Sequence, residues 1–199
     1  MKADEIRARL AVPWRHGDCI DLAGVECEDR LDLSGLDITG VDFTGAQFPQ
    51  GVEAANARFL GVSWFRGVRF GGSAHFAGAV FANDARFEES SFRNEASFAG
   101  AEFRGIGRFD SAVFHADADF SHCVCYGNFS LQEAEMRGRA SFRGAEWMGG
   151  LWCEAARLPE TADFSDTQVH GRLWLRRARA GNAALGRDRF ELYYGYCYS

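Results

Sequence analysis

Large apolar side chains recur along this chain at alternating steps of six and five residues. Two interleaved series of phenylalanines, each with a spacing of eleven, make up the centre of the chain: Phe59, Phe70, Phe81, Phe92, Phe103 and Phe114, and then Phe65, Phe76, Phe87, Phe98, Phe109 and Phe120. A helix would repeat its apolar face every three or four residues, so this spacing excludes a helical array. The period indicates a repeat architecture.

The same register continues on both sides with other apolar centres. Upstream they are Leu22, Cys27, Leu33, Ile38, Phe43, Phe48 and Ala54; downstream they are Cys125, Leu131, Met136, Phe142, Trp147, Cys153, Leu158, Phe164, Val169 and Leu175. Two residues before most centres stands a small side chain, usually alanine, and the residue between the two is mostly polar. Because side chains alternate along an extended chain, each unit predicts a short rung with an apolar inner side and a polar outer side.

Glycine stands two residues after many of these centres, and fifteen of the 23 glycines occupy that position. Such a residue lets the backbone turn a corner after each rung. A ring of corners closes a coil, and stacked coils pair their backbones at ~4.8 Å. The small residue leaves room for the large ring in a narrow lumen, where rings of successive coils are expected to stack as offset ladders.

With its small residue at i−2 and Phe or Leu at i, this pattern resembles the pentapeptide-repeat family, over about residues 20–175. The resemblance implies an all-β fold, a right-handed quadrilateral parallel β-helix with four repeats per coil and short helical caps. A coil would then hold 22 residues and place Phe43, Phe65, Phe87 and Phe109 on one face. The regular six-residue step departs from the simple family repeat, and we expect a bulged or wider corner there.

Three segments follow from this register: an N-terminal cap over residues 1–19, the β-helix over 20–175, and a C-terminal tail over 176–199. Solenoid ends expose core and unpaired strands, so they need covering. Residues 3–11 suit a short amphipathic helix with Ile6 and Leu10 on one side. The tail predicts a short helix from Asn182 and then an aromatic stretch, which either caps its own rod or, by the resemblance, forms the seam of a homodimer.

Four residues are candidates for an interaction site. Trp152 and Trp174 both hold outward positions and are 22 apart, so they should be neighbours outside one face. Exposed paired tryptophans usually contact something: either a partner or the tail, whose aromatic residues include Tyr193 and Tyr194.

Charge narrows the classes of partner. The formal net charge is −6, with −8 over residues 18–53 and +4 from Arg172 onward. We therefore expect no direct nucleic-acid binding. The N-terminal residues lack the apolar core of a signal peptide, and no run of 18 apolar residues predicts a membrane span, so we expect a cytoplasmic protein with reduced cysteines.

The sequence contains none of the common nucleotide-binding, metalloprotease or nucleophile motifs of enzymes. The run His122-Cys123-Val124-Cys125 suggests a metal site, but in register both cysteines face the lumen as small apolar residues. His115, Asp117 and Asp119 are expected to be a solvated surface group. We expect no enzyme activity, cofactor, metal or small-molecule substrate.

Two functions remain. The first is a rigid protein-protein interaction scaffold whose protein partner the sequence does not identify. The alternative rests on the resemblance, since some family members are acidic rods that mimic DNA and protect topoisomerases such as gyrase from quinolones. The acidic residues 18–171 are compatible with this, but arginines are interleaved with the acids in the middle of the chain.

Overall fold

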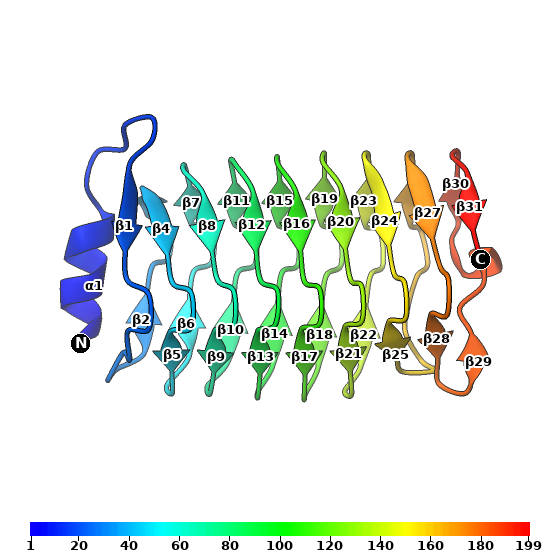
Figure 1. Ribbon diagram of the computed structural model, residues 1–199, viewed down its shortest axis with the longest axis horizontal. Helices are drawn as coiled ribbons and strands as arrows, with labels where there is room; N and C mark the ends of the chain where they lie inside the picture. The colour runs from blue at the N-terminus through cyan, green and yellow to red at the C-terminus, as the bar shows by residue number, and fades with distance from the viewer.

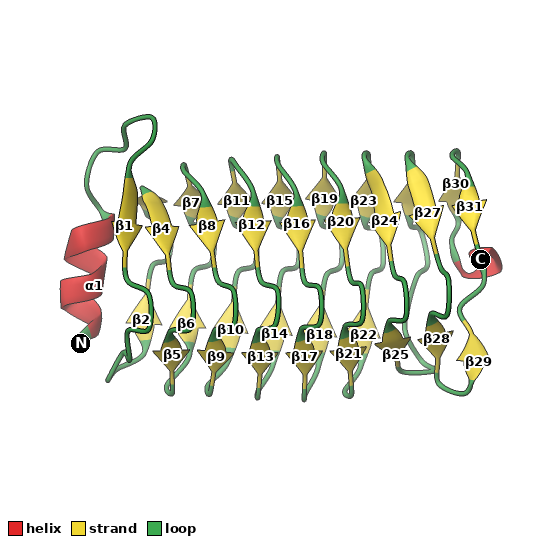
Figure 2. Cartoon of the chain, viewed as in Figure 1, coloured by secondary structure: helices red, strands yellow, loops and turns green.

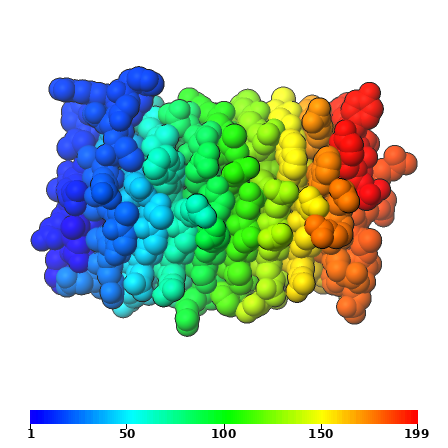
Figure 3. Space-filling view, in the orientation of Figure 1, coloured from blue at the N-terminus to red at the C-terminus, as the bar shows by residue number.

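The computed structural model describes residues 1–199 and shows a four-sided parallel β-solenoid, with the coils stacked from one terminus to the other (Figure 1). The chain visits four sheets in turn, named here faces A, B, C and D. Helix α1 (Ala3–Leu10) covers one end, and the short 3-10 helix η1 (Arg187–Arg189) lies near the other (Figure 2). The coils succeed one another in sequence order along an elongated body (Figure 3).

The strands are short, mostly two residues each. Face A has nine: β1 (Cys19–Asp21), β4 (Gly40–Asp42), β8 (Ser63–Trp64), β12 (Ala85–Arg86), β16 (Gly107–Arg108), β20 (Phe129–Ser130), β24 (Gly150–Trp152), β27 (Arg172–Trp174) and β31 (Cys197–Tyr198). Face B has eight: β5 (Gln47–Phe48), β9 (Arg69–Phe70), β13 (Ser91–Phe92), β17 (Val113–Phe114), β21 (Glu135–Met136), β25 (Arg157–Leu158), β28 (Arg179–Ala180) and β29 (Ala183–Ala184).

Faces C and D complete each coil. Face C has six strands: β2 (Leu31–Asp32), β6 (Val52–Glu53), β10 (Ala74–His75), β14 (Ala96–Ser97), β18 (Ala118–Asp119) and β22 (Ala140–Ser141). Face D has eight: β3 (Asp37–Ile38), β7 (Arg58–Phe59), β11 (Val80–Phe81), β15 (Glu102–Phe103), β19 (Val124–Cys125), β23 (Glu146–Trp147), β26 (Gln168–Val169) and β30 (Leu192–Tyr193). Neighbouring strands pair in parallel, apart from the antiparallel β28–β29 pair.

Ladders of phenylalanine rings fill the lumen. On face A the rings of Phe65 and Phe87 lie 4.6 Å apart with planes 1° from parallel, and on face B those of Phe92 and Phe114 lie 4.5 Å apart at 2°. Every centre predicted from Leu22 to Leu175 is buried. The predicted four-sided parallel β-helix, with its 22-residue coil, is therefore confirmed.

The ladders are interrupted in one coil, where a large residue takes a position normally held by a small one. Phe129 occupies the small-residue position of face A, and its ring lies against Gly107 of the preceding strand β16, where an added Cβ would come within 2.9 Å of it. It also contacts Phe103, whose own ladder continues with the smaller Cys125. Phe129 thus fills the space that Gly107 and Cys125 leave empty, in keeping with a close-packed interior.

The corners are of two kinds, although glycine is common in both. The corners from A to B and from C to D are β-turns in which the third residue has a φ between 55° and 69°, and the fourth residue donates its N–H to the carbonyl of the first. Gly100 is an example; Ala155 holds the equivalent position despite its side chain. A positive φ costs a non-glycine residue roughly 1–2 kcal/mol.

The two six-residue steps of each coil lie at the corners from B to C and from D to A. The corners from D to A are wider bends without such a turn hydrogen bond. Here glycine is needed for a different reason. A Cβ on Gly149 would collide with the carbonyl of Gly127 in the preceding coil, and one on Gly171 would collide with Gly149. The expected wider corner is therefore present, and its glycines serve close backbone approach.

The two ends are closed differently. Ile6 and Leu10 of α1 are fully buried, as predicted. The tail differs from the expected helix at Asn182, because residues 183–184 form β29 against β28 and only η1 is helical. Phe190 then covers the lumen beside Phe164 and Trp147, and strands β30 and β31 add a last coil onto β26 and β27.

The two kinds of corner give a testable difference between equal substitutions. Gly100→Ala adds strain but no collision, because nothing lies within 4 Å of its Cβ position, and should lower the free energy of unfolding by about 1 kcal/mol. Gly149→Ala forces backbone apart and should cost ~3 kcal/mol, at the upper end of overpacking. Ala155→Gly is the control and should stabilise by about 1 kcal/mol. Urea unfolding followed by circular dichroism measures all three; equal losses for the two alanine variants would contradict the distinction.

Deleting residues 186–199 should uncover the end of the core, because Phe190, β30 and β31 lie over Phe164, Val169 and Leu173. The truncated protein is expected to melt at a lower temperature and to self-associate through the exposed apolar surface. Thermal melting and sedimentation velocity test this. A truncated chain that melts and sediments like the full chain, allowing for its mass, would refute the covering role of the tail.

Candidate functional site

Exposed large apolar side chains are concentrated in the C-terminal third of the rod. They include Tyr126, Met148, Leu192, Tyr194, Tyr196 and Tyr198, of which Tyr194 is 64% and Tyr196 79% exposed. The register places most of them around one edge of the solenoid, the D-to-A corner. Monomeric proteins rarely leave large contiguous apolar patches uncovered, so this edge is the first candidate for a site.

One column of the patch lies on face A. Trp152 and Trp174 are direct neighbours in the register, and Tyr198 follows Trp174 in the next strand. The rings of Trp174 and Tyr198 stack, with centroids 4.5 Å apart and planes 30° from parallel. Both tryptophans are half-buried, and the indole N–H of Trp174 has no hydrogen-bond partner.

A second column lies just past the strands of face D. It consists of Tyr126, Met148, His170 and Tyr194, each one coil after the last. The rings of His170 and Tyr194 stack with centroids 5.0 Å apart and planes 22° from parallel. We call the two columns together with Tyr196 the aromatic surface; its members are Tyr126, Met148, Trp152, His170, Trp174, Tyr194, Tyr196 and Tyr198.

A shallow groove of about 430 Å³ runs between the two columns, along the bends of the D-to-A corner. Its floor contains Gly149, Gly171 and Gly195, and its sides carry Asn128, Trp152, His170, Arg172 and Tyr196. Arg172 has no carboxylate within 4.0 Å. The groove therefore combines bare backbone, aromatic walls and an unpaired positive charge.

The structure brings three of the four predicted residues to this edge. Trp152 and Trp174 are neighbours outside face A as predicted, and Tyr194 lies on the face D side. Tyr193 is different: it continues the lumen column of Val169 and is half-buried against the core. The sequence reasoning missed Tyr126, Met148 and His170, whose spacing of 22 was a usable signal at the position after each face D centre.

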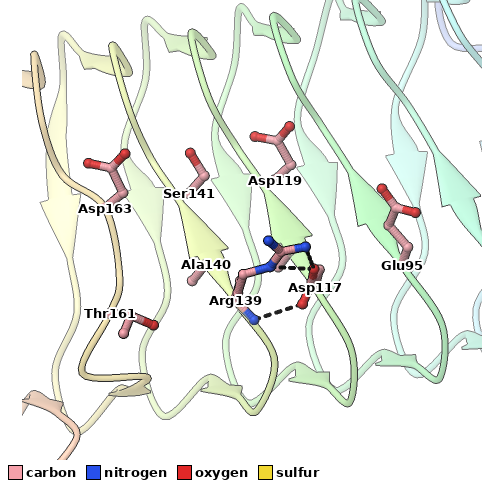
Figure 4. A pocket seen from close by; sticks show the side chains of 9 residues that line it. Glu95, Asp117, Asp119, Arg139, Ala140, Ser141, Thr161 and Asp163 are labelled. Atoms are coloured by element: carbon pink, nitrogen blue, oxygen red, sulfur yellow. Dashed lines mark hydrogen bonds and ion pairs between the residues drawn. The ribbon is translucent and has the colours of Figure 1, made fainter.

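A second hollow, of about 350 Å³, lies on face C and is polar. It is lined by acidic and hydroxyl side chains, among them Glu95, Asp117, Asp119, Thr161 and Asp163 (Figure 4). Asp119 and Asp163 accept backbone N–H groups two residues on, and Asp117 accepts the backbone N–H and the guanidinium of Arg139. Those hydrogen bonds hold the pKa of Asp117 below its usual value. These carboxylates are thus engaged in holding turns and neighbouring coils.

His115 lies beside a hydroxyl, but the arrangement does not suit proton abstraction. Its Nε2 is 3.4 Å from Ser91 Oγ, and its Nδ1 is 3.1 Å from a guanidinium nitrogen of Arg137. Arginine only donates, so Nδ1 must accept and the neutral ring carries its proton on Nε2, facing the hydroxyl. A general base for Ser91 would need that nitrogen unprotonated.

The cysteines of the His122-Cys123-Val124-Cys125 run are buried in the lumen. Burial raises the pKa of Cys125 to about 12 and that of Cys123 well above the ordinary thiol range. Both therefore stay protonated near neutral pH, whereas a metal ligand or nucleophile acts as the thiolate. No group of three histidine, cysteine or acidic side chains is placed to hold a metal ion.

The repeat matches a known protein family. A family model described as pentapeptide repeats matches two overlapping stretches, residues 65–113 and 109–157. Both stretches lie within the four-sided solenoid and share its 22-residue register. The chain is a pentapeptide-repeat protein. No curated protein matches it, and none of its helices has the length and apolar character needed to cross a membrane.

Burial divides the six cysteines of this pentapeptide-repeat protein into reactive and protected groups. Cys19 is exposed and Cys197 half-exposed, whereas Cys27, Cys123, Cys125 and Cys153 are buried. We expect a disulfide reagent to modify Cys19 first and Cys197 more slowly, and the other four only after unfolding. Partial burial of the thiol raises the pKa of Cys19, so the rate at which the reagent modifies Cys19 should increase about tenfold from pH 7 to pH 8.

Absorbance at increasing reagent times, followed by mass spectrometry of the labelled peptides, measures the order of reaction. Cys19→Ser is the matched variant and should remove only the fast phase. Rapid labelling of Cys123 or Cys125 in the folded protein would contradict their placement in the lumen.

Proposed function

We propose that this pentapeptide-repeat protein is a rigid scaffold that binds a protein partner through the aromatic surface of its C-terminal third. The observation that carries the proposal is the gathering of Trp152, Trp174, Tyr194, Tyr196 and Tyr198 around one corner. Tyrosine and tryptophan are the residues that most often dominate the binding energy of protein interfaces.

Rigidity supports this function. Backbone pairing links each coil to the next, and stacked rings fill the lumen beneath the surface columns. The stacking of Tyr198 on Trp174 and of Tyr194 on His170 holds these side chains before any partner arrives. A preorganised surface loses less conformational entropy on binding, which favours affinity for a given contact area.

The distribution of charge favours this scaffold over DNA mimicry. The outward column of face C reads Asp32, Glu53, His75, Ser97, Asp119, Ser141 and Asp163, so three non-acidic residues interrupt the line of acids. Face B and its corner to face C carry Arg69, Arg93, Arg157 and Arg179, none of which is in an ion pair. A mimic of duplex DNA would be expected to present a continuous line of negative charge. A gyrase supercoiling assay with and without a quinolone distinguishes the two.

Self-association through the last coil is the second arrangement that a specific observation favours. Strands β30 and β31 end their sheets without a following strand, so their outer edges have no pairing partner. Open strand edges are templates for pairing with another chain. A homodimer formed there would leave the columns of Tyr126, Met148 and Trp152 accessible to a different protein.

The scaffold proposal predicts which surface variants lose the partner. Tyr194→Ala and Tyr196→Ala remove highly exposed rings that contribute little to the core, so each should keep the melting temperature within about 2 °C. Each should weaken partner binding by tenfold or more, as the loss of an aromatic interface anchor does. The matched control is Trp64→Ala, an exposed aromatic on face A four strands before Trp152.

Affinity capture from the native host, quantified by mass spectrometry for the wild type and the three variants, identifies the partner. Calorimetry with the purified partner then gives each dissociation constant. The contradicting outcome would be a partner that binds both tyrosine variants as tightly as the wild type but binds the Trp64→Ala variant more weakly. The interface would then lie elsewhere on the rod.

A further inference from the structure

A line of glycines marks the D-to-A corner for the full length of the solenoid. Its members are Gly40, Gly61, Gly105, Gly127, Gly149, Gly171 and Gly195, and Asn83 is the one exception. Most of these positions lie so close to backbone of the preceding coil that no side chain fits. The corner therefore presents bare backbone to solvent, and we call it the glycine line.

The chain itself occupies the N-terminal part of this line. The segment after α1 reaches the corner, where the indole nitrogen of Trp14 comes within 2.9 Å of the Cβ position of Gly61. Trp14 and His16 form the walls of a small hollow there, together with Val62 and Asn83. Trp14 remains 36% exposed, so its contact with the corner is partial. An aromatic side chain from an irregular segment of the chain thus already contacts a glycine of this line.

The C-terminal part of the line has the same floor without a cover. The groove of about 430 Å³ lies over Gly149, Gly171 and Gly195, and the aromatic surface forms both of its walls. The backbone N–H groups of Gly149, Gly171 and Gly195 donate to no acceptor within the protein. The groove therefore offers hydrogen-bond donors as well as ring-sized apolar walls.

The spacing of these donors suits an extended peptide. Two coils advance by ~9.6 Å, taking the usual separation of paired strands. Three residues of extended or polyproline-II chain advance by about 9–10 Å. A peptide along the line could therefore place carbonyl groups three residues apart over Gly149 and Gly195, and direct the side chains between them at Trp152 and His170.

Charge defines the peptide further. Arg172 lines the groove and has no carboxylate within 4.0 Å. A guanidinium without a partner favours a carboxylate beside it, which adds specificity to the stacking of a ring. The chain's net charge of −6 makes a nucleic-acid strand the less suitable occupant.

We propose that the uncovered half of the glycine line binds an extended segment of another protein that carries an aromatic residue next to an acidic one. The inference rests on the proposed function and names the chemistry of the partner. Trp14 on Gly61 shows within the same molecule how the ring would lie.

The probe is a synthetic peptide with the sequence of the chain's own covering segment, residues 11–18, and with Arg15→Glu to place an acid beside the tryptophan. Titration into the ¹⁵N-labelled full-length protein, followed by amide NMR, should shift the signals of Gly149, Gly171 and Gly195. A peptide with Trp14→Ala as well should bind about tenfold more weakly. The unaltered sequence with arginine should bind about fivefold more weakly.

Protein variants localise the site. Arg172→Glu should reverse the preference between the glutamate and arginine peptides, whereas Arg69→Glu on face B is the matched control and should leave both affinities unchanged. The proposal is overturned if the three glycine signals stay fixed at millimolar peptide, if the alanine peptide binds equally well, or if a thymidine octanucleotide binds the groove more tightly. Should the peptide fail while Tyr194→Ala and Tyr196→Ala still lose the captured partner, the proposed function stands and only the glycine-line site falls.

Discussion

The match between two spacings underlies the whole structure. Parallel strands that share backbone hydrogen bonds lie ~4.8 Å apart, and stacked aromatic rings pack well at nearly that separation. In the lumen the rings of Phe65, Phe87 and Phe109 follow one another at 4.6 and 4.9 Å. Each coil can therefore return one ring to the place above the last one, provided that a small residue precedes it. The 22-residue lap, the inward and outward alternation and the position of every corner depend on that coincidence.

The surface inherits the same order. A residue that points outward on one coil has its counterpart directly above it, so similar residues form columns without any further device. Trp152, Trp174 and Tyr198 are such a column, and Tyr126, Met148, His170 and Tyr194 are another. A binding surface on this rod requires only that successive laps carry related residues at one position, and the rigid lumen keeps those residues aligned.

The lumen could be predicted from sequence because phenylalanine at alternating steps of five and six residues leaves no other register. The tail could not. The coil from Trp174 to Tyr198 takes 24 residues, because the β28–β29 hairpin inserts extra chain, and so the outward tyrosines do not follow the 22-residue spacing.

The role of each glycine could not be predicted from its position in the repeat. Gly100 and Gly149 hold the same place in the repeat, but glycine is required at the first by its φ angle and at the second by backbone contact. Phe129 broke the rule of small residues because its space is created by Gly107 and Cys125 in neighbouring positions, which spacing alone does not reveal.

Crowding at the D-to-A corner has opposite effects on stability and recognition. It excludes a Cβ at Gly149 and Gly171, so the corner contributes no side chain of its own to binding. The same exclusion leaves peptide N–H groups uncovered and lets a planar ring approach the backbone, as Trp14 does at Gly61. Specificity must then come from the columns on either side, where Trp152 and His170 set the width and Arg172 sets the charge. A solenoid without a deep cleft can in this way select a ligand by the residues that flank a bare corner rather than by enclosing it.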